Sequence, residues 1–382
     1  MNFNNRISSI PEYHFAKLDS IKKNALKCGR KLTDLSIGDP DLSVNIDIIR
    51  GLIEGLKVKD YNKYPPYEGT LELKKSVIKY YEEVYSVNLS LDEVIILIGS
   101  KEGINNIIPA VCDIGDYDIV PALSYPVYET CSHLWGVNTF RMHLFDENSY
   151  LPDFGKLSKE ELGKSKMMIV NYPNNPTGAV ADSSFYKEAI KFCCDNDIIL
   201  CNDGAYNEII KSNEQPISIL QSDEKKQCIE FGTLSKIYNM TGFRVGYAVG
   251  NSKIIKALLK IKSNVDSGQF IPLQHAAIEA LKLDRSYVNE IRKIYDERKM
   301  EAYKLLSAHN ISYFKGEGTF YVWCNTPRDY TTEEFCEELL NDYNIVVTPG
   351  SAFGELGRNY FRISLTCDKS DIINGLSRLK FY

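Results

Sequence analysis

The sequence predicts an α/β protein in which a large domain with a mainly parallel sheet, flanked by helices, is joined to a smaller α+β domain. Between about residues 91 and 250, short continuously apolar runs alternate with segments of helical spacing. This order is typical of parallel strands joined by crossover helices. After residue 267 the pattern changes to longer helical segments between short strands. We expect an N-terminal segment (1–45) that packs with the small domain, a large domain (46–281) and a small C-terminal domain (282–382).

The predicted strands of the large domain are continuously apolar, as expected for strands buried on both faces. They are Val94–Ile98, Asp118–Val120, Met167–Asn171, Ile198–Asn202, Cys228–Phe231 and Val245–Val249. Helical spacing predicts helices at Gly103–Val111, Pro126–Leu134 and Ser183–Asp195. Ligands of such sheets bind at the carboxyl ends of the strands, so residues that follow the strands are the first candidates for a site.

The C-terminal part of the chain predicts helices alternating with short strands. A long helical pattern from Gln274 to about Ala308 is expected to break near Asp284. The remaining predicted elements are a strand at Thr319–Trp323, a helix at Thr332–Asp342, strands at Ile345–Thr348 and Tyr360–Leu365, and a helix at Ser370–Phe381.

Composition excludes several classes of function. The formal net charge of −6 gives no electrostatic reason to expect nucleic-acid binding. No apolar run is long enough to cross a bilayer, and Met1–Arg6 lacks the apolar segment of a signal peptide, so we expect a cytoplasmic protein. The ten cysteines are scattered without a C-x-x-C pair, and neither a disulfide framework nor a metal site is expected.

Lys236 lies in the most informative motif, the run GTLSKIYNMTGFR from Gly232 to Arg244. A lysine amine can form a Schiff base with a carbonyl cofactor when burial or a nearby cation lowers its pKa. The hydroxyl side chains and the arginine eight residues later suit a phosphate group. A surface loop with an ordinary lysine explains the same run, so other residues must decide.

Two further motifs follow predicted strands. Asn171–Gly178 (NYPNNPTG) is rich in turn-forming residues and either directs an amide side chain into a site or is simply a turn. Asp203 ends a strand and precedes Tyr206 by three residues. On its own, an acid at that position is also explained as the cap of the next helix.

Another two motifs suit negatively charged ligands. Gly99–Gly103 (GSKEG) joins a strand to a helix, where backbone amides bind anions, although a simple serine cap explains it equally well. Arg362 stands inside the apolar strand YFRIS and needs a partner. That partner is either the carboxylate of a ligand or an internal acid.

Together and in this order, the motifs resemble those of the class I/II aminotransferases, the fold-type I enzymes that use pyridoxal 5'-phosphate (PLP). The resemblance covers nearly the whole chain: anion loop, aromatic residue, N-P-T-G, Asp-x-x-Tyr, S-K-x₇-R and a C-terminal arginine. Some stretches are more similar to the LL-diaminopimelate aminotransferase branch. They are Tyr64–Gly69, Ile98–Ile104, Ser263–Phe270 and Val347–Gly350.

The resemblance implies a role for each cofactor-site residue. Lys236 is expected to bond the cofactor and move protons, Asp203 to pair with its ring nitrogen, and Tyr125 to stack on its ring. Tyr206 and Asn175 are expected to hydrogen-bond its phenolic oxygen. The phosphate is expected among Ser100, Lys101, Thr233, Ser235 and Arg244. Tyr64 is expected to reach the phosphate of the other subunit, which implies a homodimer with shared active sites.

The resemblance also implies the substrates. Arg362, together with Gly38, Asn175 and Tyr13, is expected to bind an amino acid by its α-carboxylate. The implied reaction exchanges an amino group between an L-amino acid and a 2-oxo acid, with LL-diaminopimelate and 2-oxoglutarate as the preferred pair and a role in lysine biosynthesis. For the distal end of the substrate the candidates are Asn264, Asp266 and Gln269, which a structural loop at a dimer interface explains equally well.

Three alternatives share parts of this motif set. One is an aminotransferase of broad specificity for glutamate, aromatic amino acids or methionine. The second is a PLP-dependent C–S β-lyase, because the same lysine, aspartate and arginine serve both chemistries. The third is a non-enzymatic binding module fused to a DNA-binding segment, for which the chain before Gly38 is too short.

Overall fold

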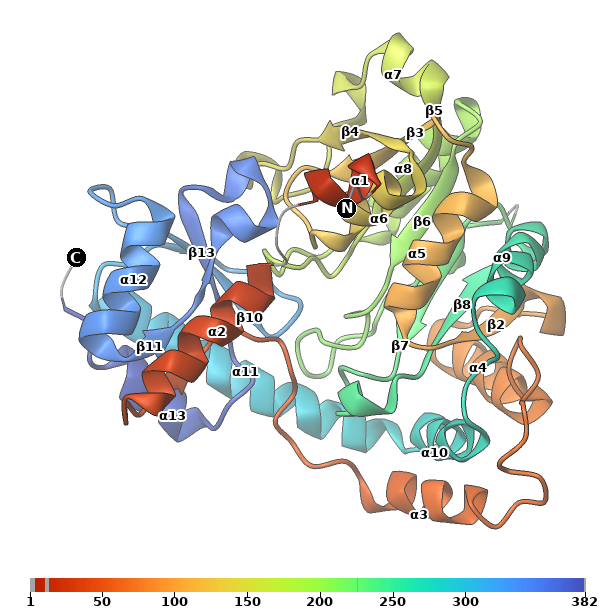
Figure 1. Cartoon of the computed structure of the whole chain (residues 1–382), viewed down its shortest axis with the longest axis horizontal. Coiled ribbons are helices and arrows are strands. Elements are labelled where there is room, and N and C mark those ends of the chain that lie inside the picture. The colour runs from red at the N-terminus through yellow and green to blue at the C-terminus, as the bar shows by residue number, and fades with distance from the viewer. Residues whose placement is uncertain (1–3, 11–13, 225, 381–382) are drawn as a thin grey trace.

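The computed structural model describes residues 4–10, 14–224 and 226–380. In these ranges the chain forms a large body around a seven-stranded sheet and a smaller body around a four-stranded sheet, and the long helix α11 (Arg285–Ala308) runs from one to the other (Figure 1). The predicted α/β fold class is confirmed. None of the described helices is long and apolar enough to cross a membrane.

The large sheet is mainly parallel, as predicted. Its strand order is β2-β8-β7-β6-β5-β3-β4, and only β8 runs antiparallel to its neighbours. The strands are β2 (Val94–Leu97), β3 (Tyr117–Pro121), β4 (Asn138–Met142), β5 (Ser165–Val170), β6 (Ile199–Asp203), β7 (Ile229–Thr233) and β8 (Gly246–Gly250). The sequence analysis did not predict β4, because this edge strand is partly exposed and lacks a continuous apolar run.

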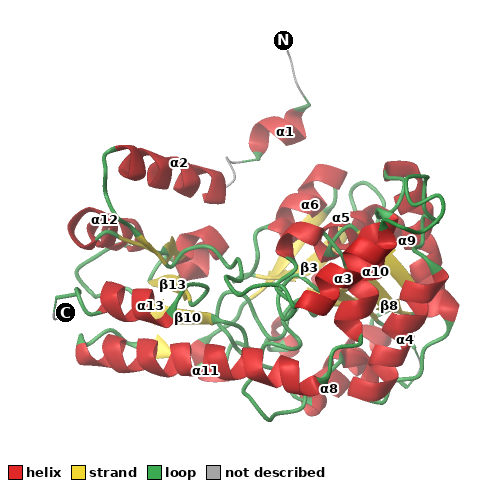
Figure 2. Ribbon diagram, turned by 90° about the horizontal axis from the view of Figure 1, so that it is seen from below, coloured by secondary structure: helices red, strands yellow, loops and turns green. Residues whose placement is uncertain are grey.

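Helices cover both faces of the large sheet, which explains why its strands are apolar throughout. In β5, Met167 and Ile169 pack on the side of α5, α6 and α9, while Met168 and Val170 pack toward α8 (Figure 2). The helices of the large body are α3 (Ile46–Gly55), α4 (Leu71–Tyr85), α5 (Ser100–Val111), α6 (Val127–Trp135), α7 (Lys159–Lys164), α8 (Ser183–Asp195), α9 (Ser252–Val265) and α10 (Ile271–Leu281).

The smaller body contains an antiparallel sheet in the order β12-β13-β10-β9 and the helices that cover it. Its elements are β9 (Tyr313–Phe314), β10 (Tyr321–Asn325), α12 (Thr332–Tyr343), β11 (Ile345–Val346), β12 (Thr348–Pro349), β13 (Tyr360–Ser364) and α13 (Lys369–Leu376). The predicted break of the long helix near Asp284 is confirmed, since the Asp284 side chain caps α11 by accepting a hydrogen bond from the Ser286 amide at 2.8 Å.

The N-terminal segment contributes α1 (Asn5–Ser9), α2 (His14–Lys27) and β1 (Thr33–Asp34). β1 pairs in parallel with β11 of the smaller body, whereas α1 lies against α6 of the large body (Figure 1). The exact domain boundaries at residues 45 and 281 stay a prediction. Short 3-10 helices lie at Leu91–Glu93, Asp146–Asn148, Phe154–Lys156, Ile219–Gln221, Thr241–Phe243, Gly350–Phe353 and Glu355–Gly357.

Candidate active site

A cavity of about 400 Å³ lies where the carboxyl ends of the parallel strands meet the smaller body. Its wall combines residues that follow β5, β6 and β7 with residues of β10, β13 and the segment around Gly38. The predicted site residues on this wall are Gly38, Ser100, Lys101, Tyr125, Asn175, Asp203, Tyr206, Thr233, Ser235, Lys236, Arg244 and Arg362. Motifs that are far apart in the sequence therefore share one cavity.

The Lys236 amine is directed across the cavity toward the N-terminal segment. Its Nζ donates a hydrogen bond to the Gly38 carbonyl at 2.8 Å and lies 5.7 Å from the centre of the Tyr206 ring. Burial lowers the pKa of Lys236, and the nearby cations Arg362 and Arg244 lower it further, while Tyr321 and Asp39 oppose these effects. An amine with a lowered pKa spends more time uncharged, as nucleophilic chemistry requires.

Asp203 is a buried acid at the end of β6, held in place by two neighbouring segments. The Tyr128 hydroxyl donates to its Oδ2 at 2.7 Å, and the Asn171 side-chain amide donates to its backbone carbonyl at 2.7 Å. Burial raises the pKa of Asp203 from 3.8 to about 6, against the opposing effects of the Tyr128 hydroxyl and the Lys236 charge. A buried carboxylate of this kind is suited to a cationic partner inside the cavity.

The groups predicted to bind an anion surround the N-terminus of α5 in the cavity. Gly99 has φ of 75°, and a side-chain Cβ there would lie 2.4 Å from Arg244 Nη2, so only glycine allows this approach. The hydroxyls of Thr233 and Ser235 lie 2.9 Å apart on the same wall. The Gln269 side chain donates to the Arg244 carbonyl and so fixes the loop that carries this arginine.

The loop before α5 is anchored by a buried ion-pair network. Lys262 on α9 is 1% exposed and pairs with Glu102 at 3.3 Å and Asp266 at 2.8 Å. Glu102 in turn accepts from the Ile98 amide at 2.9 Å, and Asp266 accepts from the Gly268 amide at 2.7 Å. The network thus fixes the backbone on both sides of the candidate anion site.

Arg362 extends from β13 into the opposite side of the cavity. Its Nη1 donates to Asn175 Oδ1 and its Nη2 to the Ser36 carbonyl, each at 2.7 Å. Its guanidinium carbon lies 3.9 Å from the centre of the Tyr321 ring and 4.7 Å from the centre of the Phe353 ring. Contact with aromatic rings leaves the N–H groups in the plane of the guanidinium available, and these are the groups that suit a carboxylate.

Two predicted site residues are not placed in this cavity. The Tyr64 side chain is 85% exposed and does not line the cavity of its own subunit. Its predicted contact with the other subunit stays a prediction. Tyr13 lies outside the described residues.

The sequence analysis missed several residues of the cavity wall, among them Asp39, Tyr128 and Tyr321. Asp39 follows Gly38 directly, and a charged residue next to a predicted site residue was a usable signal. Tyr128 lies three residues after the predicted site residue Tyr125, in the first turn of α6, and an aromatic residue so close to a predicted site residue was also a usable signal. Tyr321 had no signal, because an aromatic residue in an apolar strand is first explained as part of the core.

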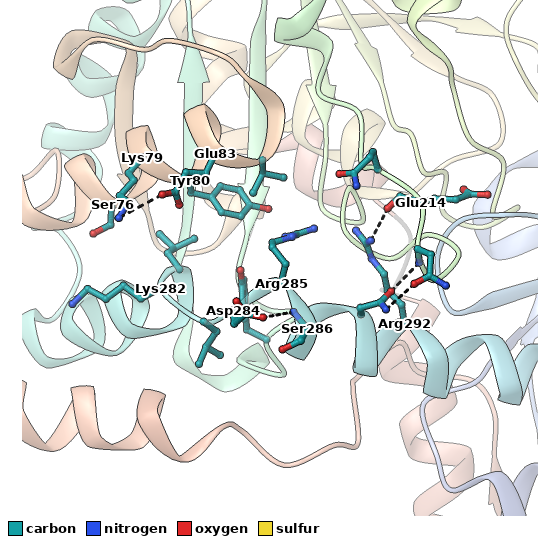
Figure 3. Close-up of a pocket in the computed structure, with 17 residues that line it drawn as sticks. Ser76, Lys79, Tyr80, Glu83, Glu214, Lys282, Asp284, Arg285, Ser286 and Arg292 are labelled. Carbon is teal, nitrogen blue, oxygen red and sulfur yellow. Dashed lines mark hydrogen bonds and ion pairs between the residues drawn. The ribbon is translucent and has the colours of Figure 1, made fainter.

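A larger cavity, of about 760 Å³, lies between α4, the turn from α10 to α11, and residues 213–215 (Figure 3). Its basic side chains are each paired with a carboxylate: Lys79 with Glu83, Lys282 with Glu279, and both Arg285 and Arg292 with Glu208. Paired charges of this kind brace the fold. We assign the candidate site to the smaller cavity, which brings together a lysine of lowered pKa and an acid of raised pKa.

The paired arginines beside the larger cavity nevertheless support the candidate site. Arg285 binds Glu208 with two hydrogen bonds, at 2.7 and 2.8 Å, and Glu208 follows Tyr206 by two residues. Glu208 is buried and also accepts a hydrogen bond from the Tyr80 hydroxyl. The network thereby fixes the segment of Tyr206 from the side away from the cavity.

Comparison with known proteins identifies close relatives over the full chain. Residues 30–379 match the family described as "Aminotransferase class I and II". The chain is 40% identical to the LL-diaminopimelate aminotransferase of Natranaerobius thermophilus over 99% of its length and 98% of the relative's. It is 42% identical to the LL-diaminopimelate aminotransferase of Maridesulfovibrio salexigens over 98% of its length and 97% of the relative's.

Solved structures with the same fold include substrate-bound BacF from Bacillus subtilis, with a TM-score of 0.95, 33% identity and coverage of 99% of this chain and 97% of that one. A probable N-succinyldiaminopimelate aminotransferase from Thermus thermophilus has a TM-score of 0.91 and 29% identity, and the alignment covers 95% of this chain and 98% of that one.

The raised pKa of Asp203 predicts how stability depends on pH. Between pH 3.8 and about 6 the folded cofactor-free protein retains a proton that the unfolded chain has lost, so the stability contributed by this group falls as pH rises. The variant Asp203→Asn lacks this titration. The free energy of unfolding in urea should be measured for both proteins from pH 4 to pH 7. The difference, variant minus wild type, should increase by roughly 2–3 kcal/mol over this range. Parallel pH curves for the two proteins would show that Asp203 ionises normally.

Proposed function

Because the chain belongs to the class I and II aminotransferase family and is an aminotransferase, we propose that it uses PLP to transfer the amino group of LL-diaminopimelate to 2-oxoglutarate. The observation that carries the proposal is the meeting of Lys236, Asp203 and Arg362 in one cavity. These three groups supply the separate chemical functions that amino-group transfer needs.

The donor set of the cavity fits PLP. A carbonyl group suits the Lys236 amine, whose pKa is lowered by burial. A protonated ring nitrogen suits the buried Asp203 carboxylate. A phosphate suits the amides at the start of α5, the hydroxyls of Thr233 and Ser235 and the Arg244 guanidinium. When bound, PLP supplies an electron sink for the carbanion that forms at the substrate Cα.

The chain's own residues then have defined tasks. Lys236 would hold the cofactor, and its amine would accept the proton that leaves the substrate Cα. Asp203 would keep the ring nitrogen protonated, and hydrogen bonds from Tyr128 and Asn171 hold Asp203 in place. Tyr206 and Asn175, which are buried and line the cavity, would hydrogen-bond the cofactor's phenolic oxygen.

Substrate binding is assigned to the edge of the Arg362 guanidinium, which matches a carboxylate with two parallel hydrogen bonds. The choice of LL-diaminopimelate rests on relatives with that name, which are 38–42% identical over nearly the full chain. Two earlier candidates for the distal end have structural contacts instead, since Asp266 pairs with Lys262 and Gln269 binds the carbonyls of Phe243 and Arg244. Asn264 is exposed and donates to the Lys260 carbonyl.

A homodimer with shared active sites is part of the proposal. Large apolar side chains are exposed along two segments, with Ile53, Leu56, Tyr64 and Tyr67 on one and Phe270 on the other. The segments are adjacent, because the rings of Tyr61 and Phe270 lie 6.4 Å apart. Large apolar side chains that are exposed on adjacent segments are typical of a subunit interface. In such a dimer Tyr64 would reach the other subunit's cavity.

The function is tested by the half-reaction of the cofactor-loaded protein with single amino donors. LL-diaminopimelate should convert the bound cofactor to its amino form, seen as a change in absorbance, and 2-oxoglutarate should reverse that change. Glutamate, an aromatic amino acid, methionine and cystathionine are the comparison donors.

Faster reaction with a donor that has a single carboxylate would contradict the diaminopimelate assignment. Release of pyruvate and ammonia from cystathionine without a 2-oxo acid would favour the β-lyase reaction instead. Failure of every donor would contradict amino-group transfer itself.

The shared site is tested by mixing two impaired variants at a PLP concentration too low to saturate Tyr64→Ala. Lys236→Ala should lower activity by roughly 10²–10⁴-fold or more, because the group that moves the proton is lost. Tyr64→Ala should weaken cofactor binding. If Tyr64 serves the other subunit, hybrid dimers contain one site with both residues intact, and mixing after exchange of subunits should restore activity. No gain over the unmixed variants would show that each subunit uses its own Tyr64.

A further inference from the structure

We propose that Tyr321 is a positioning residue that joins the two halves of the active site: its ring orients Arg362 for the substrate carboxylate, and its hydroxyl orients that of Tyr206. The inference rests on the proposed function and adds a residue to it. Tyr321 is 3% exposed, begins β10 in the smaller body and lines the cavity.

The ring half of the proposal follows from strand pairing. β10 and β13 are antiparallel, with Trp323 opposite Arg362 and Tyr321 opposite Ser364. Tyr321 and Arg362 are therefore diagonal neighbours on one face of the sheet. The guanidinium carbon lies 3.9 Å from the ring centre, which is close contact with the ring face. Such stacking restricts the guanidinium plane without using its in-plane N–H donors.

The hydroxyl half follows from a contact with the large body. The Tyr321 and Tyr206 hydroxyl oxygens lie 2.8 Å apart, and their rings meet edge to face at 5.6 Å. Both side chains are buried. When the Tyr206 hydroxyl donates to the cofactor's phenolic oxygen, its own oxygen is free to accept from Tyr321. Hydrogen bonds in such a chain strengthen one another.

Tyr321 also sets the space around Gly38. A Cβ at residue 38 would lie 1.8 Å from the Tyr321 hydroxyl oxygen, so the tyrosine requires glycine there. The Gly38 carbonyl is the acceptor for Lys236 Nζ. A single side chain thus contacts the carboxylate-binding arginine, the phenol that faces the cofactor, and the backbone segment that holds the lysine amine.

Two substitutions in the cofactor-loaded enzyme distinguish the role of the Tyr321 ring from the role of its hydroxyl. Tyr321→Phe retains the ring and removes the hydroxyl. It should leave the dissociation constant of the unreactive carboxylate glutarate within about two-fold of wild type, since the stack on Arg362 is intact. The pH midpoint of the resting cofactor absorbance should rise by roughly half a unit to one unit, because the anionic phenolic oxygen loses support equivalent to one hydrogen bond.

Tyr321→Leu removes the ring as well. The dissociation constant of glutarate and the KM of the amino donor should both rise by roughly three- to thirty-fold, in proportion to the lost contact with the guanidinium. The pH midpoint should shift as far as in Tyr321→Phe. Circular dichroism of both variants establishes that they are folded.

Tyr295→Phe is the matched control. Tyr295 is also a buried tyrosine, on α11; its ring packs 5.1 Å from Phe320, and among the described residues its hydroxyl has no hydrogen-bond partner. Loss of that hydroxyl should change neither glutarate binding nor the absorbance midpoint.

The inference is overturned if Tyr321→Phe weakens glutarate binding as much as Tyr321→Leu does, or if its absorbance midpoint equals that of the wild type. Either result with an active wild-type enzyme rejects the role of Tyr321 alone. A wild-type protein that neither binds PLP nor reacts with any amino donor instead rejects the proposed function.

Discussion

The arrangement of the site depends on holding the Lys236 amine in a buried position where it can lose its charge. The 2.8 Å hydrogen bond from Nζ to the Gly38 carbonyl fixes the amine between the loop after β7 and the N-terminal segment. Burial and the neighbouring arginines lower its pKa, whereas a fully solvated lysine is a weak nucleophile at neutral pH. Burial acts in the opposite sense on Asp203, whose pKa it raises. Burial in the same cavity thus brings the pKa values of Lys236 and Asp203 closer together.

The cavity is useful because its two sides come from different parts of the fold. The strand ends of the large body supply Asp203, Lys236 and the anion site, and the smaller sheet supplies Arg362. In the proposed function, a substrate bound by its carboxylate to Arg362 would present its amino group to Lys236, which would replace a chance encounter by fixed geometry. Buried networks behind the wall, centred on Glu208 and on Lys262, fix the backbone that carries these groups.

Local sequence patterns were sufficient to predict features that depend on residues close together in the chain. Continuous apolar runs predicted the buried strands, and because parallel strands end at a common edge, the residues after them were expected to meet. The structure does place Asp203, Asn175 and Lys236 on one cavity wall. The edge strand β4 was missed because it is partly exposed. Tyr321 and the partners of Glu208 were missed because they depend on contacts between residues 77 to 128 positions apart, which no local pattern encodes. The distal end of the substrate site was also beyond local sequence, since Asp266 and Gln269 have structural partners.

The most direct test of the account is the pKa of Lys236 in the cofactor-free protein. The rate at which an amine-specific reagent modifies Lys236, followed by peptide mass spectrometry across a range of pH, reports the fraction of uncharged amine, and the exposed Lys79 serves as an internal reference. The account predicts a midpoint for Lys236 clearly below the ordinary lysine pKa of 10.5. A midpoint at or above 10.5 would contradict the claim that burial prepares this amine for reaction.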